Sequence, residues 1–174
     1  MKKSIATRLQ TGSAPAHHLI PPPTDSAYAS APGIDPRYQR ALRLMQRDGN
    51  EAAAYPLLSA AADDGDGMSI YAIATWLLHG THVRRNLKEG NRLLRLAADK
   101  NIASACSDLA VSYYRGWGIR QSYNEAARYY LRAFLLGDGG AAEWIEKLFY
   151  WEGTKIAPRT VAREFGRLQA ARGL

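Results

Sequence analysis

The chain has 174 residues, of which 47% are hydrophobic and 22% charged, and its formal net charge is +7. Its length fits one modest globular domain, and its only cysteine, Cys106, excludes an internal disulfide, which fits a reducing compartment. The basic balance favours acidic partners, nucleic acid or anionic lipid, and it selects none of them by itself.

Residues 1–35 are rich in Ser, Ala, Pro, Thr and Gly and show no sustained hydrophobic periodicity. Such a stretch cannot bury enough apolar area to offset its ordering entropy, so we expect a disordered tail. It lacks the apolar run of a secretory signal, and no stretch approaches the ~18 apolar residues of a membrane span. We therefore expect a cytoplasmic protein, with export through a non-classical signal in the tail as the alternative.

From Pro36 onward the hydrophobic pattern has the period of a helix. The clearest apolar stripe follows i, i+3, i+4, i+7 and i+8, and a glycine ends it. Its members are Ile70, Ile73, Ala74, Leu77 and Leu78, followed by Gly80. Further stripes run over residues 87–98, 106–114 and 123–134, and none shows the alternation of a strand.

These helical segments repeat along the chain. Gly80 and Gly116 lie 36 residues apart, and the same shift places Glu89 on Glu125. A helix pair that recurs at a fixed period predicts an α-solenoid, because each pair buries its apolar stripe only by stacking on the next. The predicted units are residues 36–66, 67–102, 103–138 and 139–174.

The turn between the two helices of a unit has its own signals. Gly116 is predicted at the position after the helix end, where a left-handed backbone is needed. Ser122 is predicted to cap the next helix, with Glu125 in a capping-box relationship to it.

At these positions the sequence resembles the Sel-one-like repeat family, whose members are relatives of the tetratricopeptide repeat. The matching residues of the unit at 103–138 are Ala105, Leu109, Ala110, Tyr113, Gly116, Gly118, Ile119, Ala126, Tyr129, Ala133, Phe134 and Gly137. The preceding unit has His82 in place of the second glycine and Gly90 in place of a helix alanine. The resemblance implies an all-α fold, a short α-solenoid of stacked antiparallel helix pairs forming a superhelix behind the N-terminal tail.

Stacked helix pairs form a concave groove lined mainly by the first helix of each pair. We expect nine positions off the core stripe to line it: Tyr71, Thr75, His79, Ser107, Val111, Arg115, Trp144, Leu148 and Glu152. Tyr71 and Trp144 would be the anchors, because exposed aromatic residues dominate interface energies. The alternative for Trp144 and Leu148 is that they pack the last helices together.

A basic stripe of three arginines, Arg159, Arg163 and Arg167, is spaced at i, i+4 and i+8. It either contacts an acidic partner or a nucleic-acid backbone, or forms a solvated face. Further arginines on the second helices are interpreted as solvated in the same way: Arg92, Arg95, Arg128 and Arg132. Nucleic acid is not the expected partner, because neither a known motif nor interleaved exposed aromatics accompany these charges.

No phosphate-binding loop, nucleophile elbow or paired-carboxylate constellation is present in the sequence. The DDGDG run at residues 63–67 misses the spacing of a calcium loop and is interpreted as a turn between repeats. Cys106 lies on an apolar stripe and is interpreted as a buried structural thiol. We therefore expect no metal, no cofactor and no enzyme activity.

The sequence thus favours a non-catalytic protein–protein interaction module that binds a partner, acidic in character, in the concave groove. Repeats that resemble these occur in bacterial signalling adaptors, secretion-associated factors and immunity proteins that neutralise a toxin, so we expect an adaptor, a scaffold or an immunity-type protein. Two alternatives stay open. One is a secreted effector with an N-terminal export tail, and the other is a nucleic-acid binder that uses its basic surface.

Overall fold

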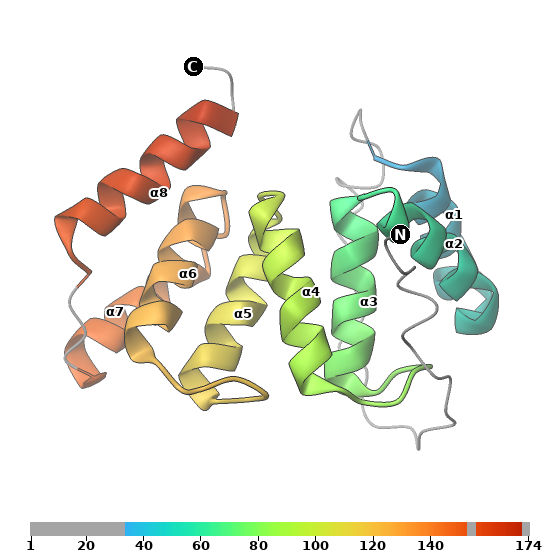
Figure 1. The fold of residues 1–174 in the computed structure, drawn as a ribbon, viewed down its shortest axis with the longest axis horizontal. Coiled ribbons are helices and arrows are strands. Elements are labelled where there is room, and N and C mark those ends of the chain that lie inside the picture. Colours follow the sequence, from blue (N-terminus) through green and yellow to red (C-terminus); the bar gives the residue numbers. More distant parts are fainter. Residues whose placement is uncertain (1–33, 153–155, 172–174) are drawn as a thin grey trace, which may run out of the picture. The chain divides into compact units, whose positions relative to one another are not determined.

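The computed structural model describes residues 34–152 and 156–171, which form helices and connecting turns with no β-strand among them (Figure 1). The helices are α1 (Pro36–Asp48), α2 (Glu51–Asp63), α3 (Gly67–His79), α4 (Leu87–Asp99), α5 (Ala103–Arg115), α6 (Tyr123–Leu135), α7 (Ala141–Glu152) and α8 (Pro158–Ala171). The predicted all-α fold is confirmed, whereas the predicted disordered tail lies outside the described residues. No helix in the described ranges combines the length and the apolar character needed to cross a membrane.

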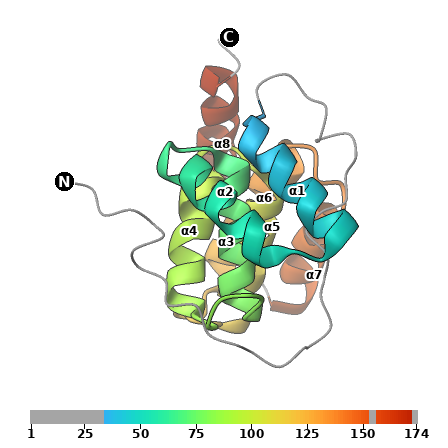
Figure 2. The ribbon, with the colours of Figure 1, turned by 90° about the vertical axis from the view of Figure 1, so that its right-hand side faces the viewer.

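The helices belong to two compact units, the first ending at Leu96 and the second beginning at Ala97. In the first unit α1 packs on α2 and α2 packs on α3, and Figure 2 shows α1 beside α2. In the second unit α6 contacts α5, α7 and α8. The helix α6 is therefore the element on which the rest of the second unit is assembled.

Helices α5 and α6 contact each other, and both carry buried side chains of small size. Five alanines of these two helices have no exposed surface: Ala105, Ala110, Ala126, Ala127 and Ala133. Side chains of this size let two helix backbones approach closely, while Leu109 and Tyr130 fill the larger spaces beside them. Four of these five alanines, all except Ala127, are positions that the repeat pattern marks.

The turn between α5 and α6 requires a glycine at its start. Gly116 has φ +72°, and its amide donates a hydrogen bond to the carbonyl of Ser112. A Cβ at this position would lie 3.3 Å from the Cβ of Gln121, so both the dihedral angle and the available space favour glycine. The predicted left-handed helix end is confirmed.

The predicted capping box at the start of α6 forms only in part. The hydroxyl of Ser122 accepts a hydrogen bond from the amide of Glu125 at 3.3 Å, as expected. The Glu125 carboxylate does not return this bond, because it accepts from Nε of Arg128 at 3.0 Å, and the Ser122 amide donates to the carbonyl of Tyr113 instead. The second hydrogen bond of the capping box is absent because the Glu125 carboxylate forms an i, i+3 ion pair with Arg128.

Two aspartates of the acidic run at residues 63–67 stabilise the first unit through a helix cap and an ion pair. The carboxylate of Asp66 accepts a hydrogen bond from the amide of Ser69 at 2.7 Å and so caps α3. Asp64 pairs with the guanidinium of Arg37 at 2.7 Å. These contacts agree with the interpretation of the run as a turn.

In the first unit, α4 lies close to α3 at Gly90, the residue that replaces a family alanine. A Cβ at Gly90 would lie 2.9 Å from two side-chain carbons of Leu78 and 3.2 Å from the carbonyl oxygen of Ala74. Both distances are shorter than ordinary van der Waals contact. The exchange of alanine for glycine therefore allows this pair of helices to pack against Leu78.

We predict that Gly90→Ala lowers the free energy of unfolding by about 1 kcal/mol. An overpacked site costs about 1–3 kcal/mol, which exceeds the helix-propensity gain of about 1 kcal/mol from replacing glycine. Urea denaturation followed by far-UV circular dichroism measures the change. In a Leu78→Ala background, which removes the two closest atoms and leaves the Ala74 carbonyl oxygen at 3.2 Å, the same substitution should cost less. An equal loss in both backgrounds would show that Leu78 is not the cause.

Candidate functional site

Aromatic rings gather in the second unit where α5 ends and α7 begins. The ring of Tyr114 lies 5.6 Å from that of Tyr123 and 5.7 Å from that of Trp144, centroid to centroid. Trp144 also stacks on Tyr130, with centroids 5.6 Å apart and ring planes 4° from parallel. Because Tyr130 is buried, this stack fixes the half-buried Trp144 to the core of the unit.

Two cation–π contacts in the second unit involve Trp144 and a second tryptophan, Trp117. The ammonium of Lys147 lies 4.8 Å from the centroid of Trp144, and the guanidinium carbon of Arg115 lies 5.0 Å from the centroid of Trp117. Trp117 is on the turn after α5 and is 45% exposed. Cation–π contacts at exposed sites contribute about 0.5–1 kcal/mol each, so they hold these large side chains in place. We call Tyr114, Arg115, Trp117, Tyr123, Trp144 and Lys147 the aromatic surface.

The predicted groove residues of α5 have three different environments. The hydroxyl of Ser107 donates a hydrogen bond to the carboxylate of Asp138, which ties α5 to the turn before α7. Val111 is half-buried, and Arg115 is exposed and belongs to the aromatic surface. Of these residues, Arg115 is therefore the one that offers its side chain most freely to a partner.

The predicted residues of α7, Trp144 and Leu148, differ in whether they pack inside the unit or reach its surface. Leu148 is buried inside the unit, so the expectation that it lines a groove is corrected: its side chain packs the helices together. Trp144 is half-buried and stacks on Tyr130, as the packing alternative expects, while Lys147 lies over its ring; its place in a groove stays a prediction. The side chain of Glu152 lies outside the described residues.

In the first unit the predicted anchor is also buried. Tyr71 is only 6% exposed, so the burial of its ring corrects the expectation of an accessible aromatic residue. The hydroxyl of the half-buried Thr75 donates to the carbonyl of Ala72 at 2.8 Å, and His79 is exposed. Only His79 among the three predicted residues of α3 has a largely accessible side chain.

The sequence prediction missed Tyr114, Trp117, Tyr123 and Lys147, because it considered only first-helix positions at fixed offsets. A signal for Trp117 was present, since the 36-residue shift places it on Thr81 of the preceding unit. A tryptophan at a turn where the other repeat has a small polar residue indicates a role beyond the fold.

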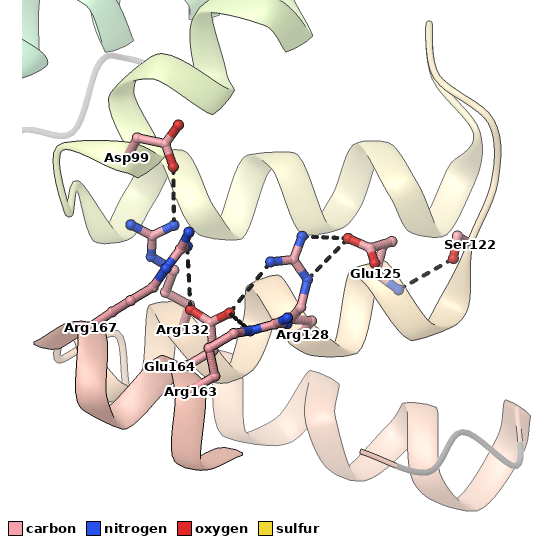
Figure 3. Close-up of polar contacts among 8 residues, drawn as sticks. All are labelled: Asp99, Ser122, Glu125, Arg128, Arg132, Arg163, Glu164 and Arg167. Carbon is pink, nitrogen blue, oxygen red and sulfur yellow. Dashed lines mark hydrogen bonds and ion pairs between the residues drawn. The ribbon is translucent and has the colours of Figure 1, made fainter. Parts of the chain in front are cut away.

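A buried carboxylate joins α8 to α6 (Figure 3). Glu164 has no exposed surface, and it is the only buried residue among the α8 side chains that the structure describes. Its Oε1 lies 3.4 Å from Nη1 of Arg128 on α6. Charged side chains are rarely buried without a partner, so this pair fixes where α8 docks.

The three arginines of the basic stripe are all exposed, and two of them flank this carboxylate (Figure 3). Nε of Arg163 lies 3.7 Å from Oε1 of Glu164, and Nη1 of Arg167 lies 3.8 Å from its Oε2. Arg159 lies one turn before Arg163 on the same helix. The three arginines of the basic stripe therefore lie along one exposed side of α8.

The expectation that Arg132 is solvated is wrong. Its side chain is 4% exposed, donates to Oδ1 of Asn101 at 3.1 Å and lies 3.6 Å from Oδ1 of Asp99. Asn101 has a left-handed backbone (φ +62°) in the turn that follows α4. Arg132 thus holds that turn against α6, which is a structural role that the helical spacing does not reveal.

Comparisons with known proteins identify the repeat. The Sel1 repeat model matches residues 67–102 and 103–138. Chitin synthase regulatory factor 2 of Schizosaccharomyces pombe is 34% identical over 86 residues, which cover 46% of this chain and only 17% of that protein.

Two solved structures resemble this fold. A Sel1 repeat protein from Oxalobacter formigenes has a TM-score of 0.59 and 20% identity, over 64% of this chain and 86% of the other. A protective antigen of uropathogenic Escherichia coli with an SLR fold has a TM-score of 0.60 and 19% identity, over 77% of this chain and 28% of the other. At these identities the two likenesses show the fold alone.

We predict that Cys106 does not react with a thiol reagent at pH 8 until the protein unfolds. The side chain is fully buried, and this burial raises the pKa of the thiol to about 12. Because the thiol of the unfolded chain ionises at lower pH than the folded one, stability should fall as pH rises above about 9. A Cys106→Ser control identifies the thiol's share, and rapid labelling of the folded protein would contradict the prediction.

We predict that Glu164→Ala loosens α8 while α5 and α6 stay folded. Loss of one partner from a buried pair costs about 1–3 kcal/mol, so amide hydrogen exchange in α8 should accelerate by about 5- to 150-fold. Arg159→Ala is the matched control on the same helix, since no ion pair of Arg159 is seen in the described part of the chain. Unchanged exchange in α8 would show that Glu164 does not hold it.

Proposed function

We propose that this chain, which carries two Sel1 repeats, is a non-catalytic module that binds another protein. Sel1 repeats generally mediate protein–protein interactions, and the family is typically non-enzymatic. Within that class the role we propose is that of an adaptor, a scaffold or an immunity-type protein.

The observation that carries the proposal is the aromatic surface of the second unit. Trp117 is 45% exposed and lies on a glycine turn beside the end of α5. Tryptophan, tyrosine and arginine are the residue types that most often dominate binding energy. A rigid aromatic side chain loses little conformational entropy on binding, so a surface of this kind suits recognition of a protein.

The charge of the surface supports an acidic partner. Arg115 and Lys147 lie over the two tryptophans, and Glu143 is the ion-pair partner of Lys147 at 2.7 Å. With a chain net charge of +7, approach of an acidic protein is favoured at long range. Arg115 contributes the positive charge beside Trp117 that a partner carboxylate would meet.

The predicted groove contributes part of the proposed contact area. In the second unit Arg115 and Trp144 belong to the aromatic surface, Val111 lies one turn before Arg115 on α5, and Ser107 lies one turn before Val111. In the first unit, Thr75 and His79 remain proposed contacts of that unit, with His79 the more accessible.

Trp117→Ala should weaken partner capture at least about tenfold without unfolding the protein, because hot-spot truncations cost about 2 kcal/mol or more. The experiment is affinity capture from the source cells, followed by titration of the partner identified. Leu96→Ala is the matched control, since Leu96 is another exposed apolar residue, at 40%. Equal capture by the wild type, Trp117→Ala and Arg115→Gln would overturn the proposed site.

A further inference from the structure

We propose that the exposed side of α8 binds an acidic amphipathic helix of a partner protein. This inference rests on the proposed function, because it assigns the chemistry of a protein partner to a second surface of the same unit. It uses the basic stripe, Arg159, Arg163 and Arg167, and the small and apolar residues beside it.

All the charge that α8 presents to solvent is positive. The charged residues of this helix are the three arginines of the basic stripe and one carboxylate, Glu164. The arginines are exposed, whereas Glu164 is completely buried against α6. A partner that approaches α8 from solvent therefore meets guanidinium groups with no exposed carboxylate between them on this helix.

The carboxylates near the contact of α8 with α6 offset only part of this charge. Glu125 hydrogen-bonds Arg128 on its own helix, and Asp99 pairs with Arg132 (Figure 3). Glu164 remains, and three guanidinium groups share it.

At 3.7 Å and 3.8 Å, the contacts of Arg163 and Arg167 with Glu164 are longer than hydrogen bonds. Within the described residues, the donors of these two side chains are held near one another while they keep hydrogen-bonding capacity for a closer acceptor. Guanidinium donors of this kind bind carboxylates strongly, in paired geometry.

The spacing of the arginines fits a series of carboxylates. A helix rises 1.5 Å per residue, so Arg159, Arg163 and Arg167 are placed at steps of about 6 Å over about 12 Å. Carboxylates at i, i+4 and i+8 of a partner helix have the same spacing. An isolated phosphate group would engage one pair of arginines and leave the rest of the row unused.

The other exposed residues of α8 favour a protein helix over a nucleic-acid backbone. Val161 and Phe165 are 41% and 52% exposed and lie four residues apart, on one face of the helix. Successive residues are separated by about 100° around a helix axis, so Ala162 and Gly166 lie between these apolar residues and Arg159. A partner helix laid along these small residues can approach closely, with apolar side chains toward Phe165 and carboxylates toward the arginines.

The test uses the full chain and a synthetic helical peptide of about four turns, with leucine on one side and glutamate at four-residue spacing on the other. We expect saturable binding that weakens with salt and falls at least about tenfold in the Arg159→Gln/Arg163→Gln double variant. The matched control is Arg40→Gln/Arg43→Gln, which removes two exposed arginines from α1 and should bind as the wild type does. Hydrogen exchange verifies that α8 stays docked in each variant.

Other occupants appear as outcomes of the same experiment. Equal binding by both double variants, or by a peptide with glutamine in place of glutamate, would overturn the proposal. So would tighter binding of an oligonucleotide or of anionic vesicles than of the acidic peptide, or self-association that Phe165→Ala abolishes. If Trp117→Ala abolishes partner capture while Arg159→Gln/Arg163→Gln leaves both capture and peptide binding unchanged, the proposed function stands and this inference fails.

Discussion

The close contact of α5 with α6 is the constraint on which the second unit depends. Both helices carry fully buried alanines, and side chains of this size let helix backbones approach closely. Helices this close must be joined by a narrow turn, and Gly116 provides it with a left-handed backbone. Trp117 is the next residue of this turn, so the turn sets its position. The most exposed aromatic residue of the aromatic surface is therefore a consequence of the same packing that pairs the helices.

The helix α8 is attached to α6 by a buried ion pair rather than by buried apolar side chains among those described. Its only buried side chain among those described is a carboxylate, and two of its large apolar residues, Val161 and Phe165, are exposed. Glu164 follows Arg128 by 36 residues, so it occupies the repeat position that Arg92 and Arg128 hold on α4 and α6. At this repeat position α4 and α6 have a positively charged arginine, whereas α8 has the negatively charged Glu164. A buried ion pair contributes little net stability, but it specifies which partner is correct, so Glu164 sets the register of α8 on α6.

The parts of the fold that the sequence predicted are those governed by local rules. Ser122 and Gly116 act through their own backbone neighbours, so their roles could be derived from spacing alone. Burial of Arg132 depends on Asn101 and Asp99, which come from the turn after another helix, and no helical period reveals that contact.

The candidate surface was harder to predict for the same reason. Leu148 and Tyr71 lie at positions that the repeat offset assigns to a groove, yet neighbouring elements bury them. Trp117 is on a turn, outside any helical stripe. A repeat pattern gives the position of each residue on its own helix, whereas exposure depends on which other elements pack beside that helix. The aromatic surface therefore combines Arg115 and Trp144, which follow the repeat offset, with four residues that the offset did not indicate.

Both proposed surfaces of the second unit are supported by one helix. Tyr130 of α6 lies beneath Trp144, and Arg128 of α6 holds Glu164. These two residues are about 200° apart around the helix axis, so they face different neighbours. The alanine contact with α5 restrains α6 from sliding, and features with no shared partner behave additively. Binding at the aromatic surface and binding on α8 should therefore be energetically independent, and two weak contacts on one rigid helix would combine their affinities for a partner long enough to reach both.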